Sequence, residues 1–125
     1  DVGTSAVIEE ELVGSLGFAT IVTRIRDKEQ FLPEYVCYYL NSADNKRNIS
    51  RMTKSDRSNL NLKDFNKLMI PVFDVDTQKR IVQMLSQFHA ICTDTQAGLP
   101  AEIEARHKQY EYYRDKLLTF ERKVV

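Results

Sequence analysis

Residues 76–118 read DTQKRIVQMLSQFHAICTDTQAGLPAEIEARHKQYEYYRDKLL, and hydrophobic residues recur through this stretch at helical intervals. Early in the stretch the apolar positions alternate steps of four and three residues, which is the spacing of a helix face that packs against another helix. Gly98 and Pro100 interrupt the pattern, because glycine favours a helix C-terminus and proline restricts the residue before it to extended conformations. The stretch therefore predicts two long helices, over residues 76–97 and 100–122.

Apolar residues of the two predicted helices form a seam that another helix must cover. The roughly 75 residues before them make a small domain with limited cover to offer. We therefore expect a partner helix from a second repeat or a second copy, with the two rods kinked but roughly collinear. An antiparallel hairpin within the chain is the alternative. The predicted helix-packing interface comprises Ile81, Leu85, Phe88, Ile103, Tyr110, Tyr113, Leu117 and Phe120.

Before these helices, residues 1–75 carry the mixed signals of a small lobe. Residues 16–26 are rich in β-branched and apolar types and partly alternate, which predicts a strand. Residues 6–13 are a weaker candidate strand. Residues 68–72 predict a further strand that ends near Pro71, because proline cannot donate to a ladder.

Helices are also expected within the lobe. Pro33 suits the first turn of a helix, where no backbone donor is needed, and Asn61 can cap a short helix over residues 62–67. One face of the first helix then carries Tyr35, Val36, Tyr39 and Leu40. The predicted fold class is α+β, with a small mixed lobe over residues 1–75 followed by long coiled-coil-like helices over residues 76–125.

The composition is that of an ordinary soluble protein. The 125 residues suit one modest domain with an appendage, since 42% are hydrophobic and 29% are charged. No apolar run approaches the roughly 20 residues that cross a membrane, and we see no signal peptide. Because the chain opens on Asp1 in mid-pattern, we expect a fragment of a larger protein. Cys37 and Cys92 lie in apolar helical contexts, which favours reduced thiols and a cytoplasmic location.

The charges balance overall but are unevenly distributed. The chain holds 18 basic and 18 acidic residues, which argues against a protein that coats nucleic acid indiscriminately. Residues 1–12 contain four acids and no base. Residues 43–67 contain seven bases and three acids, so that segment carries a charge of +4.

Three motifs follow one another along the second half of the chain. They are Ile70-Pro71 at the end of a predicted strand, Gln78-Lys79 with Ile81-Val82 at the start of a helix, and Gly98 through Leu118 with its segment Lys108-Gln109-Tyr110-Glu111-Tyr112-Tyr113-Arg114-Asp115. Over residues 60–120 this order resembles the DNA sequence-specificity subunit of type I restriction-modification systems. Two departures stand out, with Phe73-Asp74 where the family often has Pro-Pro, and Asp76 where a glutamate is usual.

The resemblance implies DNA recognition without catalysis. In this family a target recognition domain presents loops to the major groove of double-stranded DNA, and spacer helices set the distance between two such domains. Methyltransferase and restriction subunits are the protein partners. Residues 1–75 would then be part of a DNA-binding domain, and residues 76–125 a helical spacer or dimerisation region. Whether the chain is one repeat of a full-length subunit or a half-length form that dimerises stays open.

A polar loop after the first lobe helix is the main candidate DNA contact. Arginine and lysine suit phosphates and base edges, while asparagine, serine and threonine are short hydrogen-bonding readers. Such a composition is also typical of a solvated loop. Two arginines on one face of the strand predicted over residues 16–26 could reach phosphate as well. The candidate DNA-binding residues are Arg51, Thr53, Lys54, Arg57, Ser58, Asn59, Arg24 and Arg26.

The sequence gives no residue to nominate for catalysis. His89 and His107 sit on separate predicted helices with no cysteine or carboxylate at ligand spacing, so we expect no metal site. The chain has neither a glycine-rich phosphate loop nor a nucleophile motif of the G-x-S-x-G type. We therefore expect a non-catalytic protein without a cofactor. The alternative is a helical assembly or scaffold protein whose lobe binds another protein rather than DNA.

Overall fold

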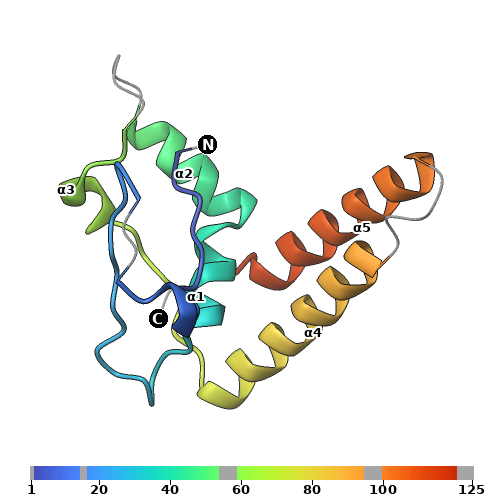
Figure 1. The fold of residues 1–125 in the computed structure, drawn as a ribbon, viewed down its shortest axis with the longest axis horizontal. Coiled ribbons are helices and arrows are strands. Elements are labelled where there is room, and N and C mark those ends of the chain that lie inside the picture. Colours follow the sequence, from blue (N-terminus) through green and yellow to red (C-terminus); the bar gives the residue numbers. More distant parts are fainter. Residues whose placement is uncertain (1, 15–16, 54–58, 95–99, 121–125) are drawn as a thin grey trace.

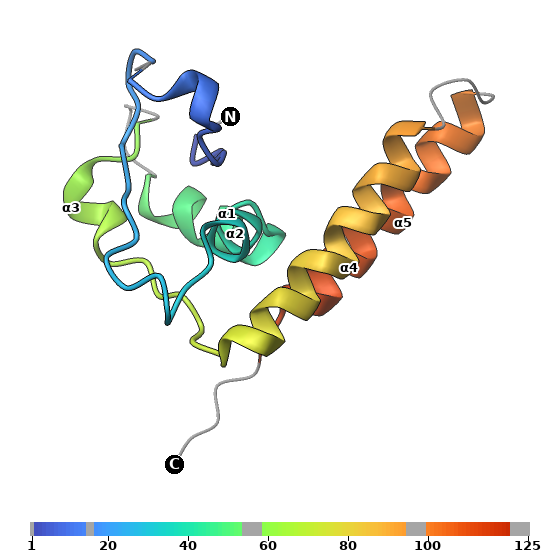
Figure 2. The same ribbon diagram turned by 60° about the horizontal axis from the view of Figure 1, so that its bottom comes forward.

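The computed structural model describes residues 2–14, 17–53, 59–94 and 100–120. Within them, short helices and irregular chain form a lobe, and two long helices project from it as an antiparallel pair (Figure 1). Figure 2 shows the same pair from another side, with the long helices running next to each other. The elements are η1 (Glu10–Leu12), α1 (Pro33–Leu40), α2 (Ala43–Met52), α3 (Leu62–Phe65), α4 (Val75–Asp94) and α5 (Pro100–Leu118).

The α+β prediction is wrong, because the described residues contain helices and no strand. Residues 6–13 include the 3-10 helix η1, and the described part of residues 16–26 is irregular, as are residues 68–72. Positive φ angles at Gly14 and Ala19 turn the chain away from an extended path. A strand also needs a neighbour to complete its backbone hydrogen bonds, and a β-rich composition does not supply that neighbour.

The helix predicted to begin at Pro33 is confirmed as α1. Pro33 occupies its first turn, where no backbone donor is needed. α2 follows almost at once because Ser42 caps it, its hydroxyl accepting a hydrogen bond from the backbone N–H of Asn45. The buried Asn45 side chain donates to the Leu40 carbonyl at 2.8 Å and so ties the start of α2 to the end of α1.

The short helix predicted after Asn61 is confirmed as α3. The Asn61 side-chain oxygen accepts a hydrogen bond from the backbone N–H of Asp64 at 2.8 Å, which is the expected N-terminal cap. α3 ends at Phe65, two residues before the predicted end. Local capping therefore located this helix well from the sequence.

The core lies where the base of the long helices meets α1. Tyr35 and Leu85 have no exposed surface, and the Tyr35 hydroxyl donates to the Pro71 carbonyl at 3.0 Å. Phe73 contacts the rings of Tyr35 and Phe120, with centroids 6.4 and 4.6 Å apart. The buried apolar residues of this core cluster come from α1, the first three turns of α4 and the end of α5. They are Tyr35, Val36, Leu40, Ile81, Leu85 and Leu118.

The two long helices form a hairpin, so the preferred prediction of collinear rods is wrong and the alternative holds. Phe88 of α4 stacks on Tyr113 of α5, with ring centroids 5.1 Å apart. Nearer the tip, the Cys92 thiol donates to the Arg106 carbonyl at 3.5 Å. As the residue number rises along α4, the number of its contact on α5 falls, which is the pattern of an antiparallel pair (Figure 1).

The predicted seam residues pack within the chain. Ile81 and Leu85 are buried in the core, and Leu117 and Phe120 pack partly against it. Phe88 stacks on Tyr113, while Ile103 and Tyr110 are half-buried on α5. Because the hairpin and α1 cover these residues, the seam by itself does not require a partner helix.

The two cysteines, Cys37 and Cys92, are free thiols, as expected, and each is half-buried. Burial raises the pKa of the Cys37 thiol, which favours its protonated form near neutral pH. This thiol donates to the Ser5 carbonyl at 3.4 Å. In the described part of the chain, no helix is both long and apolar enough to span a bilayer.

Candidate nucleic-acid interface

α2 has a buried inner face and a basic outer face. Asn45 and Ile49 are 1% and 2% exposed, so they define the side of the helix that faces the lobe. Residues three and four apart share one side of a helix, and Arg47, Ser50 and Arg51 therefore lie on the opposite side. All three are exposed. The capping of α2 at Ser42 sets this orientation, because it fixes where the helix begins.

The charge of α2 is positive. Its bases are Lys46, Arg47 and Arg51 and its one acid is Asp44, so three minus one gives +2. Arg47 pairs with Asp44 on the exposed side of the first turns. An exposed ion pair is worth little, since both partners are well hydrated. The Arg47 guanidinium can therefore exchange this carboxylate for a phosphate at small cost.

The described residues include part of the predicted DNA-binding loop. Arg51 is exposed near the end of α2, and Asn59 is exposed where the described chain resumes. Thr53 is half-buried, and its hydroxyl donates to the Ile49 carbonyl at 3.0 Å, which leaves this hydroxyl less suited to reading a base. The other three predicted contacts, Lys54, Arg57 and Ser58, lie outside the described residues.

Arg24 and Arg26 lie together at a different place. Both are exposed and line a hollow of about 420 Å³ between the segment after residue 22 and the chain that follows α3. Asn66 and Asp27 join them in its wall, and the remaining wall is largely apolar. Neither Arg51 nor Asn59 lines this hollow, so the described DNA-binding candidates fall into two groups, one at the hollow and one at α2 and the chain after it.

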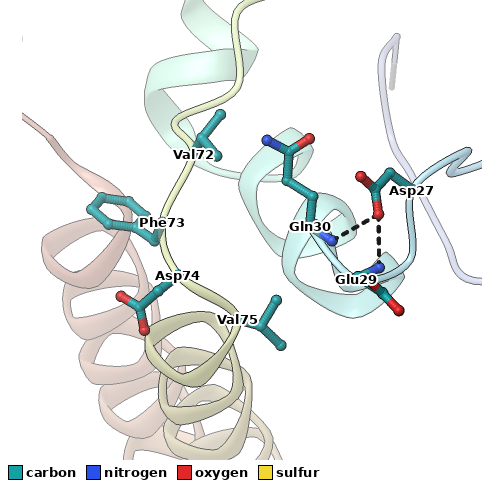
Figure 3. A pocket seen from close by; sticks show the side chains of 7 residues that line it. All are labelled: Asp27, Glu29, Gln30, Val72, Phe73, Asp74 and Val75. Atoms are coloured by element: carbon teal, nitrogen blue, oxygen red, sulfur yellow. Dashed lines mark hydrogen bonds between the residues drawn. The ribbon is translucent and has the colours of Figure 1, made fainter.

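A second hollow, of about 490 Å³, is acidic. It lies between the turn at residues 27–30 and the connector at residues 72–75, and Figure 3 shows Asp27, Glu29 and Asp74 around it. The Asp27 carboxylate accepts hydrogen bonds from two backbone N–H groups of the turn, at 3.0 and 3.1 Å. Three carboxylates repel phosphate, so we exclude this hollow as a DNA contact.

The aromatic residues of the hairpin serve packing. Tyr113 stacks on Phe88, and His89 contacts the ring of Tyr110 with centroids 6.0 Å apart. Burial raises the pKa of the Tyr110 hydroxyl, consistent with its position between the helices. Among the residues that the structure describes, no three histidine, cysteine, aspartate or glutamate side chains are grouped to hold a metal ion.

The predicted DNA contacts omitted Arg47 and Ser50. Their signal was present in the sequence, because a helix begun at the capping residue Ser42 with Ile49 turned inward places both beside Arg51. The prediction took its contacts after the first lobe helix only from the loop expected over residues 51–59 and did not consider the helical residues before it. The helix extends the candidate interface by about one turn, from Arg51 back to Arg47.

Comparisons with known proteins agree with one another. Residues 1–105 match the model of the type I restriction modification DNA specificity domain. The chain is 38% identical over 95 residues to the EcoR124I/EcoR124II type I restriction enzyme specificity subunit of Escherichia coli, a match that covers 74% of this chain and 23% of the relative. Two Mycoplasma pneumoniae proteins named as type I specificity subunits are 31% identical over 70 residues and 27% identical over 96 residues.

The Mycoplasma matches cover 56% and 77% of this chain, and 29% and 30% of the relatives. The chain thus spans less than a third of the length of these three relatives. No solved structure gives a significant match.

Proposed function

The chain belongs to the family of type I restriction-modification DNA specificity domains, and from this premise we propose that it is part of a subunit that recognises double-stranded DNA. The subunit directs methyltransferase and restriction subunits to a target site and performs no chemistry itself. In this proposal residues 1–75 belong to the DNA-binding domain. Residues 76–125 form the helical spacer.

The outer face of α2 is the observation that supports DNA binding best. Arg47 and Arg51 are exposed on one side of a helix whose other side is anchored in the lobe. Side chains held in this way can reach neighbouring phosphates without reordering the backbone. Lys54 and Arg57 follow α2 in the sequence and lie outside the described residues, so the positive charge continues along the sequence. Exposed Ser50 lies beside Arg47 and Arg51 on α2, and exposed Asn59 follows in the sequence; both carry short hydrogen-bonding groups.

Arg24 and Arg26 form a second contact in this proposal. They lie at the rim of an apolar-walled hollow rather than on α2. Two separated groups of cations suit a duplex, whose phosphates follow both sides of a groove. We assign these two arginines to the phosphate backbone, because the guanidinium group pairs readily with phosphate oxygens.

The outer side of the hairpin is the proposed contact for a second spacer. Met84 and Tyr112 remain 39% and 60% exposed although the seam between α4 and α5 is covered. A second helical pair, from another repeat or another copy, would bury them. Helical pairs that stack in this way form a four-helix bundle, an arrangement that holds two recognition domains at a set distance.

The test of DNA binding uses the full-length subunit assembled with its methyltransferase. In the Arg47→Ala/Arg51→Ala variant we expect weaker binding to a duplex that carries the target. Each lost phosphate contact should reduce the slope of log affinity against log salt by about one, so the double variant should lose about two. Fluorescence anisotropy across a salt series measures that slope.

A matched control removes two exposed bases from the hairpin. Among the described residues, Lys79 and Lys108 form ion pairs with acids of their own helices, at 3.9 and 2.8 Å from Asp76 and Glu104. The Lys79→Ala/Lys108→Ala variant changes the net charge equally and should leave the slope unchanged. Equal slopes for the two double variants would contradict a DNA contact at α2.

A further inference from the structure

Gln78 lies where the lobe meets the hairpin and is completely buried in the first turns of α4. A buried amide must find partners for its oxygen and its nitrogen, because losing water without replacing its hydrogen bonds is costly. In the sequence, Gln78 belongs to the motif that marks the start of a helix, and this motif does not indicate that its side chain is buried. The partners that it finds therefore reveal what the residue holds together.

All three partners of Gln78 are backbone groups. The side-chain oxygen accepts a hydrogen bond from the backbone N–H of Leu32 at 2.9 Å. The side-chain nitrogen donates to the carbonyls of Gln30 and Phe73, at 2.7 and 2.8 Å. One side chain thus joins α4 to the turn before α1 and to the connector that enters α4.

The turn and the connector are not packed tightly against each other beside this amide. The hollow of about 490 Å³ separates them, with Gln30 on one side and Phe73 on the other (Figure 3). Apolar contacts in the neighbouring core are strong but non-directional. Hydrogen bonds weaken steeply when their angles change. Gln78 is therefore placed to set the direction of the hairpin relative to the lobe. The core contacts hold the hairpin close to the lobe without setting that direction.

A second polar contact acts at the other end of the junction. The Asp115 carboxylate of α5 accepts hydrogen bonds from the backbone N–H of Ala43, at 3.2 Å, and from the Arg114 guanidinium, at 3.1 Å. This contact joins the start of α2 to α5. The hairpin could still rotate relative to the lobe if only one of these contacts were present. With one contact on each long helix, that rotation is resisted.

We propose that Gln78 is a positioning residue that fixes the angle between the DNA-binding lobe and the helical spacer, and so the separation of the two DNA segments that an assembled specificity subunit reads. This inference rests on the proposed function. A change of angle at the base of the hairpin is multiplied by the distance to the DNA, so a small rotation shifts the lobe along the duplex. Rise along B-DNA is about 3.4 Å per base pair, which makes a shift of that size detectable.

The test changes Gln78 in the full-length subunit assembled with its methyltransferase. Methylation mapping of the wild-type complex first identifies the two half-sites. Duplexes then carry these half-sites at the native separation or with one base pair added or removed. We expect Gln78→Met to lower the preference for the native separation at least tenfold, while affinity for a duplex with one half-site stays within twofold. Gln78→Asn, which keeps an amide but is too short to reach all three partners, should behave in the same way and serves if Gln78→Met fails to fold.

Two control variants separate positioning from stability. Gln83→Met changes an exposed glutamine of the same helix and should alter nothing. Ile81→Val weakens the same junction through its core, so it lowers stability without removing a hydrogen bond. An equal loss of preference in Ile81→Val, or an unchanged preference in both Gln78 variants, would overturn the inference. A wild-type complex that does not distinguish the separations would instead count against the proposed function.

Discussion

Two regions of the molecule use apolar residues in opposite ways. One is the junction between α1 and the hairpin, and the other is an arm formed by residues 7–14 and 17–24. At the junction, Tyr35, Leu85 and Leu118 are at most 1% exposed. In the arm, Val13 is 75% exposed and Phe18 is fully exposed. Both regions are rich in hydrophobic residues, so hydrophobicity alone does not place a residue in the core. What differs is that three helices, distant in sequence, meet at the junction, whereas the arm follows the surface.

The largest expected effect separates these two regions directly. Leu85→Ala leaves a cavity in the junction and should lower the free energy of unfolding by about 3 kcal/mol. Phe18→Ala removes a larger side chain but should change that free energy by less than about 0.5 kcal/mol, because the ring is exposed. Urea unfolding of the 125-residue chain, followed by circular dichroism, measures both. A comparable loss in the two variants would show that the arm belongs to the core.

The same contrast explains which elements could be predicted from the sequence. The starts of α1 and α3 follow from Pro33 and Asn61, which act on backbone groups within three residues of themselves. The strands were predicted wrongly because a strand is stabilised by a neighbour rather than by its own residues. Composition in residues 16–26 indicates a preference for extended backbone, and nothing local indicates whether a partner strand is adjacent.

The hairpin shows the same limit on a larger scale. A break at Gly98 and Pro100 permits either a kink or a reversal, and the periodicity on each side is identical in both cases. Only tertiary contacts such as the stacking of Phe88 on Tyr113 decide between them. The α2 part of the candidate site was predictable in principle from its cap. The role of Gln78 was not, because its partners lie 46 and 48 residues away at Leu32 and Gln30.

An intermediate effect is expected within the junction, in Tyr35→Phe. The variant keeps the buried ring but removes the hydrogen bond to the Pro71 carbonyl, which should cost about 1 kcal/mol at neutral pH. Burial, and to a smaller extent the neighbouring Tyr39, raises the pKa of Tyr35 from 10.0 to about 12. The stability that this shift contributes is complete below pH 10.0 and is lost as the pH rises towards about 12.

Alkaline unfolding tests the Tyr35 prediction. The wild-type chain should lose stability more steeply than Tyr35→Phe between pH 10 and pH 12, because only the wild type must ionise this buried hydroxyl on unfolding. Tyr112→Phe is the matched control, since Tyr112 is 60% exposed. If Tyr112→Phe flattened the alkaline limb as much as Tyr35→Phe, burial at the junction would not be the cause.

The smallest expected effect concerns Asp74, which is exposed like the arm but adjoins the junction. Its carboxylate accepts hydrogen bonds from the hydroxyl and the backbone N–H of Thr77, at 2.6 and 2.8 Å, at the start of α4. These bonds lower the pKa of the Asp74 carboxyl below its ordinary value of 3.8. A carboxyl group whose pKa is lowered by folding stabilises the folded state at pH values above its ordinary pKa. That stabilisation is lost as the pH falls through the lowered pKa.

Asp74→Ala should therefore unfold at a lower temperature than the wild type at neutral pH, and the difference should shrink as the pH falls below 3.8. Calorimetry over that range measures the shrinkage, with Asp76→Ala as a control that also removes an exposed acid near the start of α4. A difference that stayed constant with pH would contradict the cap. Because water screens an exposed carboxylate, the effect should remain below that of Tyr35→Phe. If Asp74→Ala and Tyr35→Phe lowered stability equally, the exposure of a residue would not determine its contribution to stability, contrary to the contrast between Leu85 and Phe18.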